Sequence, residues 1–123
     1  METLKGKQVL VVGATGTIGA AIVKLLVASG ALVAIAGRNS GKLAELATSV
    51  GIAPQRCFQI DLSNTASIQA AMKDLHQAMP VVDILVNAAG VGIIKPVETL
   101  TEAEFMQSLQ INLISVFHLM QAI

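Results

Sequence analysis

The sequence predicts an α/β protein in which a doubly wound parallel sheet carries helices on both faces. The short apolar runs VLVV, LVAIA and ILV lack polar alternation, which is typical of strands buried on both faces. Segments with helical spacing separate these runs, so consecutive strands require right-handed crossovers. The predicted strand order is 3-2-1-4. In such a sheet, ligands bind at the carboxyl ends of the first and fourth strands, where the winding reverses.

The first half of the chain is expected to alternate strand and helix. Residues 9–12 form the first strand, and residues 18–29 form a helix with Ile22, Leu25 and Leu26 on one side. Gly30 closes this helix, as a glycine beyond a C-terminus does. The remaining elements are a strand over 31–36, a helix over 41–50 with Ser40 as its N-cap, and a strand near 57–60 after a turn at Pro54.

The second half continues the alternation. Residues 63–79 form a helix that Pro80 ends, and its buried face is predicted to carry Ile68, Ala71, Met72, Leu75 and Met79. Residues 81–86 form the fourth strand. Thr101 and Glu104 have the spacing of a capping box at the start of the last helix. The stripe predicted along that helix consists of Phe105, Leu109, Asn112, Val116 and Met120.

Composition narrows the possible functions. The 123 residues have a net charge of +0 and only 13% charged residues, so no basic field is expected to attract nucleic acid. Glycines interrupt the apolar stretch over 8–37, which argues against a membrane span. Cys57 is the only cysteine, which favours a reducing, cytoplasmic setting and a small core residue over a reactive thiol. Neither His76 nor His118 has a second ligand at metal-site spacing, so no metal is expected.

The stretch VVGATGTIGAA places glycines at 13, 16 and 19 between the first strand and the first helix. Unpaired backbone amides and the positive end of a helix attract phosphate at such a place. Thr15 and Thr17 add hydroxyl donors, and glycines allow a ligand to approach without a Cβ clash. The alternative is a tight turn that packs the helix on the strand and holds no ligand.

Arg38 follows the second strand, about where a dinucleotide-binding fold reads the adenosine ribose. An acidic residue there would accept from a 2′-hydroxyl, whereas a guanidinium complements a 2′-phosphate. Asn39, Ser40 and Lys42 are close enough in sequence to assist Arg38. The alternative for Arg38 is a solvated loop charge.

The motifs GATGTIG, QIDLSN, LVNAAG and QINLISVFHLMQA occur in this order, and with them the chain resembles the N-terminal half of the short-chain dehydrogenase/reductase family from about residue 5 to residue 123. The resemblance implies a Rossmann-type domain over 1–123 that is incomplete at its C-terminal side. It also implies NADP(H) in preference to NAD(H), given Arg38. The residues it assigns to the pyrophosphate loop are Gly13, Thr15, Gly16, Thr17, Ile18 and Gly19.

The same resemblance assigns further contacts with the cofactor. Asp61 would accept from the adenine amino group and Leu62 would supply backbone polar groups, although Asp61 could instead cap the following helix. The segment Asn87, Ala88, Ala89 and Gly90 would leave room for the cofactor ribose. Asn112 would help hold a proton-relay water in catalysis; its alternative is a hydrogen-bonded core asparagine without a chemical role.

The chain departs from the family pattern in two ways. Its glycine spacing of 13, 16 and 19 is nearer to the extended and atypical branches, and it contains no tyrosine, so it lacks the family's phenolic acid/base. We expect the cofactor-binding half of an oxidoreductase for a small alcohol or carbonyl substrate, inactive on its own and homo-oligomeric through the last helix. The alternatives are a non-catalytic NAD(P)-binding or redox-sensing module and an interaction or scaffold fragment.

Overall fold

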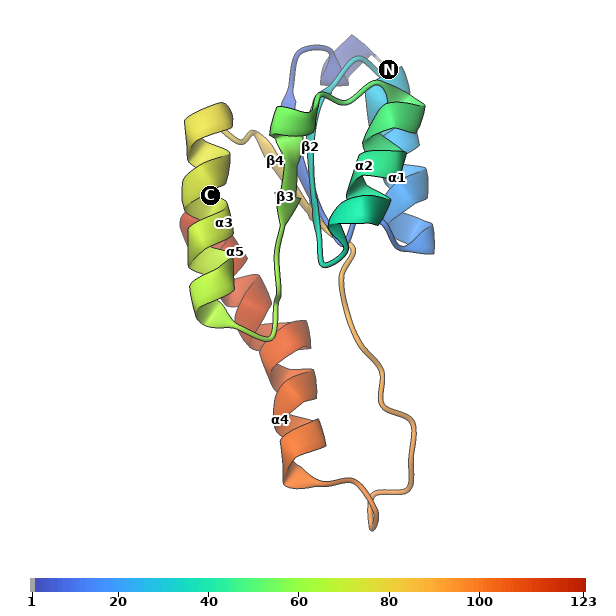
Figure 1. Cartoon of the computed structure of the whole chain (residues 1–123), viewed down its shortest axis with the longest axis vertical. Helices are drawn as coiled ribbons and strands as arrows, with labels where there is room; N and C mark the ends of the chain where they lie inside the picture. Colours follow the sequence, from blue (N-terminus) through green and yellow to red (C-terminus); the bar gives the residue numbers. More distant parts are fainter. Residues whose placement is uncertain (1) are drawn as a thin grey trace.

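The computed structural model describes residues 2–123 and contains a four-stranded parallel sheet in the order β3-β2-β1-β4. This Rossmann-type order confirms the prediction. Figure 1 shows α1 and α2 on one side of the sheet, with α3 and α5 on the other. The elements are η1 (Glu2–Leu4), β1 (Gln8–Val12), α1 (Thr17–Ala28), β2 (Leu32–Gly37), α2 (Ser40–Val50), η2 (Pro54–Arg56), β3 (Cys57–Gln59), α3 (Thr65–Ala78), β4 (Ile84–Asn87), α4 (Glu102–Leu109), the π-helical turn η3 (Gln110–Ile114) and α5 (Ser115–Ala122).

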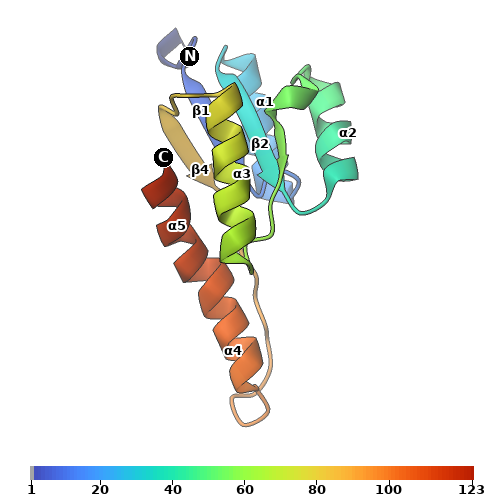
Figure 2. The same ribbon diagram turned by 60° about the vertical axis from the view of Figure 1, so that its left-hand side comes forward.

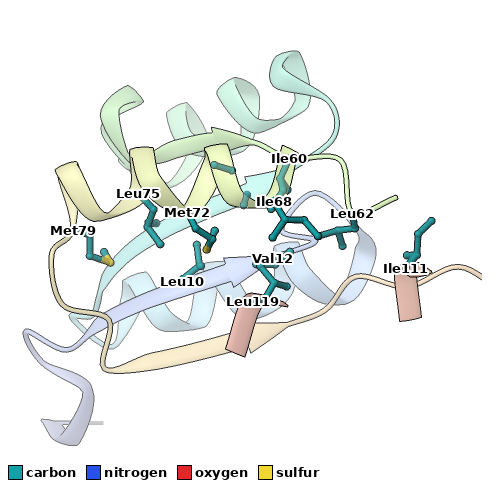
Figure 3. Packing of buried hydrophobic residues seen from close by; sticks show 13 residues of the cluster. Leu10, Val12, Ile60, Leu62, Ile68, Met72, Leu75, Met79, Ile111 and Leu119 are labelled. Carbon is teal, nitrogen blue, oxygen red and sulfur yellow. The ribbon is translucent and has the colours of Figure 1, made fainter. Parts of the chain in front are cut away.

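Each face of the sheet has its own core. Leu10 and Val12 of β1 pack with α3 and α5, while Val9 and Val11 pack with α1 and α2. All of these side chains are fully buried, which explains why β1 shows no polar alternation. Figure 3 shows the first of these cores, where the predicted apolar face of α3 covers the sheet and Leu119 closes it from α5.

The N-cap of α2 and the start of the fourth strand differ from the prediction. Asn39, and not Ser40, is the N-cap of α2: its Oδ1 accepts from the amide of Lys42 at 3.0 Å. The fourth strand begins at Ile84 instead of residue 81, because its partner β1 begins only at Gln8. Asp83 joins the sheet just ahead of the strand, where its Oδ2 accepts from the Gln8 amide at 2.8 Å.

The predicted face of α1 is only partly confirmed. Leu26 packs against the core, whereas Leu25 is 64% exposed and the buried residues of the helix are Gly19 and Val23. The cause lies in the glycine stretch, because Gly19 packs against the carbonyl oxygen of Gly13 and so sets the rotation of the helix. Leucine spacing alone did not contain that constraint.

The last helix shows the largest departure from the prediction. It runs without a break but is not a regular α-helix throughout, since the π-helical turn η3 lies between α4 and α5, and its buried residues are Ile111, Ser115 and Leu119. Phe105 and Met120 from the predicted stripe are 51% and 66% exposed. In Figures 1 and 2, α4 and the loop that leads to it extend beyond the sheet, while α5 returns to lie beside α3.

Within residues 2–123, no helix has the length and apolar character needed to cross a bilayer. The same described residues contain no group of three or more His, Cys, Asp or Glu side chains suited to a metal ion. Cys57 is half-buried and packs against the core beneath α2, as expected, and burial raises the pKa of its thiol.

Candidate functional site

The parallel register brings the carboxyl ends of the strands to one edge of the sheet. Val12 pairs with Ala36 of β2 and with Asn87 of β4, and Gly37 pairs with Gln59 of β3. The segments that leave these strands enclose a cleft of about 230 Å³. The predicted site residues that line it are Gly13, Thr15, Gly16, Arg38, Asp61, Leu62, Ala88, Ala89 and Gly90.

Gly13, which lines the cleft, and Gly19, which lies behind it, have packing roles. Gly13 has a φ of 76°, and a Cβ there would lie 2.5 Å from the backbone nitrogen of Ala89. A Cβ on Gly19 would lie 2.1 Å from the carbonyl oxygen of Gly13. Only glycine allows β1, α1 and the segment after β4 to approach so closely. For these two glycines, the close-packing alternative accounts for the residue type.

Gly16 differs from the other two glycines of the motif. A Cβ there would meet only the Gly13 oxygen, at an ordinary 3.6 Å, and Gly16 is the N-cap of α1 without any side-chain cap. The helix ladder begins with the amide of Ala20 donating to the Gly16 carbonyl at 2.9 Å. The amides of Thr17 and Ile18 precede that bond, and such amides are available to an anion. Packing does not explain Gly16, but a ligand close to the backbone would.

Arg38 lines the cleft at the end of β2. Its carbonyl oxygen accepts from Nε2 of Gln59 at 3.0 Å, which fixes the backbone at this turn. Its side chain is exposed and forms no ion pair with another residue of the described chain. The Oδ1 atom of Asn39 is engaged in capping α2, so its side-chain NH2 is the group left to donate to a ligand.

Asp61 lines the cleft after β3, with its carboxylate held in a tight turn. Its Oδ1 accepts from the hydroxyl of Ser63 at 2.6 Å and from the Ser63 amide at 3.0 Å. These bonds lower the pKa of Asp61, and the positive charge of Arg38 lowers it further. Asn64 caps α3 in its place. The helix-cap alternative for Asp61 is therefore wrong, and its carboxylate is held ionised beside Arg38.

Asn112 holds the loop that follows β4. Its Oδ1 accepts from the Val91 amide and its Nδ2 donates to the Val91 carbonyl, both at 2.8 Å. A Cβ on Gly90 would lie 3.2 Å from this Oδ1, so Gly90 leaves space for the amide. Asn87 turns the chain in a similar way, accepting from the Ala89 amide at 3.2 Å. Asn112 is exposed, so it is not a core asparagine.

Several predicted residues lie around the cleft without lining it. Thr17 and Ile18 are at the start of α1, with Ile18 70% exposed, and Gly19 is buried behind them. The sequence motifs did not mark the apolar residues of the cleft, which are Val12, Gly37, Ile60, Val91 and Ile111. Val91 follows the predicted residue Gly90, and Ile111 precedes the predicted residue Asn112. Their position next to a motif was the sequence signal that could have placed them in the site.

A Rossmann-type sheet with a glycine-lined cleft at the carboxyl ends of β1 and β4 defines an α/β protein of the nucleotide-binding class. The family model described as short chain dehydrogenase matches residues 7–123. The chain therefore belongs to the short-chain dehydrogenase/reductase family.

Individual relatives agree with this assignment. A D-threitol dehydrogenase of Mycolicibacterium smegmatis is 37% identical over 122 residues, which are 98% of this chain and 47% of that protein. An NADP-dependent (R)-specific alcohol dehydrogenase of Lentilactobacillus kefiri is 36% identical over 117 residues, which are 94% of this chain and 46% of that protein. The crystal structure of a blue fluorescent protein from a metagenomic library in complex with NADPH matches with a TM-score of 0.87 at 29% identity, covering 97% of this chain and 50% of that one. The chain spans about half the length of these relatives.

Proposed function

We propose that this chain binds NADP(H), in preference to NAD(H), as the cofactor-binding part of an oxidoreductase. The observation that carries the proposal is Gly16: it opens onto the cleft beside uncapped amides of α1, with the exposed Arg38 at the same edge. The names of two relatives support the cofactor, since one is NADP-dependent and one is in complex with NADPH.

The residues present fit such a cofactor. The amides of Thr17 and Ile18 would receive the pyrophosphate, and Thr15 would add a hydroxyl donor. Arg38 would bind the 2′-phosphate, with Asn39 beside it. Asp61, held ionised by Ser63, would accept from the adenine amino group, and Leu62 would supply backbone polar groups. Ala88, Ala89 and Gly90 would leave room for the second ribose because their side chains are small.

When bound, the cofactor would transfer a hydride to or from the carbon of an alcohol or carbonyl substrate. The chain's own contribution to proton transfer would come from Asn112, which would help hold the relay water next to the loop that it fixes at Val91. The 123 residues contain no tyrosine, so a phenolic acid/base would have to come from other residues. The same fact favours a second candidate, a non-catalytic NAD(P)-binding or redox-sensing module.

A titration tests the proposed cofactor. NADPH fluorescence is expected to report saturable binding that is tighter than NADH binding. Arg38→Asp is expected to weaken NADPH by about 10-fold to 100-fold, the equivalent of a charge-assisted hydrogen bond of roughly 1.5 to 3 kcal/mol, while NADH changes little. Lys73→Asp, an exposed lysine on α3, is the matched charge control and should leave both affinities unchanged. Equal effects of Arg38→Asp on the two nucleotides would remove Arg38 from the phosphate site.

Turnover separates the two candidate functions. The 123 residues contain no tyrosine, so on their own they are expected to bind without turnover under either candidate. Reduction of a small carbonyl compound by NADPH with a natural chain that combines them with a tyrosine acid/base supports the oxidoreductase, and binding without turnover in that chain supports the module. Absence of binding at millimolar nucleotide would contradict both. The proposal includes the cytoplasmic setting inferred from the single cysteine.

We also propose a homo-oligomer formed through the last helix. Leu113, Phe117 and Met120 of this helix are 63%, 56% and 66% exposed, and an apolar surface of this kind is typical of an interface. Phe117→Glu is expected to shift sedimentation toward a smaller species, because a buried carboxylate would oppose association. Glu102→Gln, at the exposed start of α4, is the control and should leave the sedimentation unchanged. A monomeric wild-type protein would contradict this part.

A further inference from the structure

The helix that runs past the cleft changes its hydrogen-bond pattern at η3. In an α-helix the Ser115 amide would donate to the carbonyl of Ile111, four residues earlier. Here it donates to the carbonyl of Gln110, five residues earlier. The wider turn therefore withdraws from Ile111 the amide that would normally pair with its carbonyl oxygen. π-helical turns are rare in proteins, and those that do occur are frequently found at functional sites.

Ser115 supplies the missing partner. Its side chain is fully buried, and its Oγ donates to the Ile111 carbonyl oxygen at 2.5 Å. Ile111 is itself buried, and a carbonyl without a partner is unfavourable in such a place. Thr48 makes a bond of the same spacing to Ala44, at 2.9 Å, but on the exposed face of the regular helix α2. The bond made by Ser115 differs in replacing a backbone bond that the π-turn has moved.

The turn that Ser115 supports connects three parts of the cleft. Gln110 donates from Nε2 to the carbonyl of Leu62 at 3.4 Å, which ties the turn to the loop after β3. Ile111 and Val91 line the apolar wall. Asn112 makes both of its bonds to Val91. In a regular α-helix through 110–114, these consecutive side chains would lie at different angles around the axis. The contacts of Gln110, Ile111 and Asn112 could then not all form at the same time.

We propose that Ser115 is a positioning residue for the cofactor cleft. Its hydroxyl stabilises the π-turn, the π-turn places Asn112 against Val91, and the Val91 loop forms one wall of the cleft. The link from the loop to nucleotide affinity rests on the proposed function, whereas the link from Ser115 to the loop does not.

Amide exchange measured by NMR tests the first link. Ser115→Ala removes only the hydroxyl. It is expected to raise the exchange rate of the Val91 amide about five-fold, the equivalent of one net hydrogen bond, and to broaden the signals of the Asn112 side-chain NH2. Ser115→Cys keeps the shape with a weaker donor and should give an intermediate rate. Thr48→Ala is the matched control, because it removes the same type of bond from a regular helix and should leave Val91 unchanged.

The outcomes decide between a local and a general role. If Ser115→Ala raises the exchange rate of the Val91 amide no more than the exchange rates of the amides in the core strand β1, the proposal is overturned, because the variant has then lost overall stability and not the local support of the loop. If Ser115→Ala does not fold, the cysteine variant decides, and wild-type exchange at Val91 in that variant overturns it. Weaker NADPH binding in Ser115→Ala supports the second link, while unchanged binding with a loosened loop refutes that link alone. Failure of the wild type to bind nucleotide contradicts the proposed function and leaves the exchange test intact.

Discussion

Replacing Gly19 by alanine is expected to destabilise the fold, whereas the same change at Gly16 should mainly affect the ligand. A Cβ on Gly19 would lie 2.1 Å from the carbonyl oxygen of Gly13 and 2.9 Å from its carbonyl carbon. This carbonyl belongs to the backbone and also accepts from the Gly16 amide at 3.3 Å, so it cannot rotate away as a side chain would. Relief of the clash requires α1 to move off β1.

The magnitude follows from opposing contributions. Overpacking a core costs about 1 to 3 kcal/mol, and a rigid backbone atom favours the upper end. Alanine recovers about 1 kcal/mol because it favours the helix over glycine. The net loss for Gly19→Ala is therefore about 2 kcal/mol, or roughly 8 °C in Tm for a domain of this size. Gly16 has a φ of −71° and an open Cβ position, so Gly16→Ala should cost under about 1 kcal/mol, the difference between glycine and alanine at an N-cap.

Urea denaturation followed by far-UV circular dichroism measures the stabilities, and NADPH titration at a temperature where both variants are folded measures binding. We expect Gly16→Ala to weaken NADPH at least about tenfold, because its methyl group occupies space at the uncapped amides. If Gly19→Ala were as stable as the wild type, the packing argument would fail. If Gly16→Ala bound NADPH normally, Gly16 would not face the phosphate.

Two further predictions concern Asn39 and Asp61. Asn39→Ala should cost about 1 kcal/mol in urea denaturation because the N-cap of α2 is lost, while Ser40→Ala, one residue later, should change little; the reverse order would restore Ser40 as the cap. The pKa of Asp61 is lowered by the Ser63 hydrogen bonds, so its ionised form stabilises the folded state at neutral pH and that contribution is lost as pH falls through the folded-state pKa. Asp61→Asn should therefore lower Tm at about pH 7, the difference should shrink as the pH falls below the ordinary range of an aspartate, and a pH-independent difference would refute the role of the ionised carboxylate.

The strand order and the edge that carries the site could be predicted from sequence because both depend on short-range patterns. Continuous apolar runs mark strands buried on both faces, and alternation with helices requires crossovers. The faces of α1 and of the last helix could not be predicted in this way. The rotation of α1 depends on contact between Gly19 and a carbonyl of the preceding turn. The phase of the last helix depends on the π-turn, which no apolar periodicity reveals.

The candidate site shows the same division. Residues that a motif marks by type, such as Gly13, Arg38 and Asp61, do line the cleft. Val91 and Ile111 line it as well, but an apolar residue beside a motif looks like any core residue until the loop and the helix are brought together. Their meeting depends on the Asn112 side chain, which bonds to a backbone 21 residues away in sequence.

The two walls of the cleft are held by different kinds of interaction, and this difference determines how each wall responds to substitution. The Gly13 wall is fixed by backbone approach, so only added volume disturbs it. The Val91 wall is fixed by the side-chain hydrogen bonds of Asn112 and Ser115, so loss of a single polar group loosens it without filling space. Under the proposed function, the first wall would offer fixed amides to a phosphate. The second wall would offer the second ribose a loop held by side-chain hydrogen bonds of modest net strength.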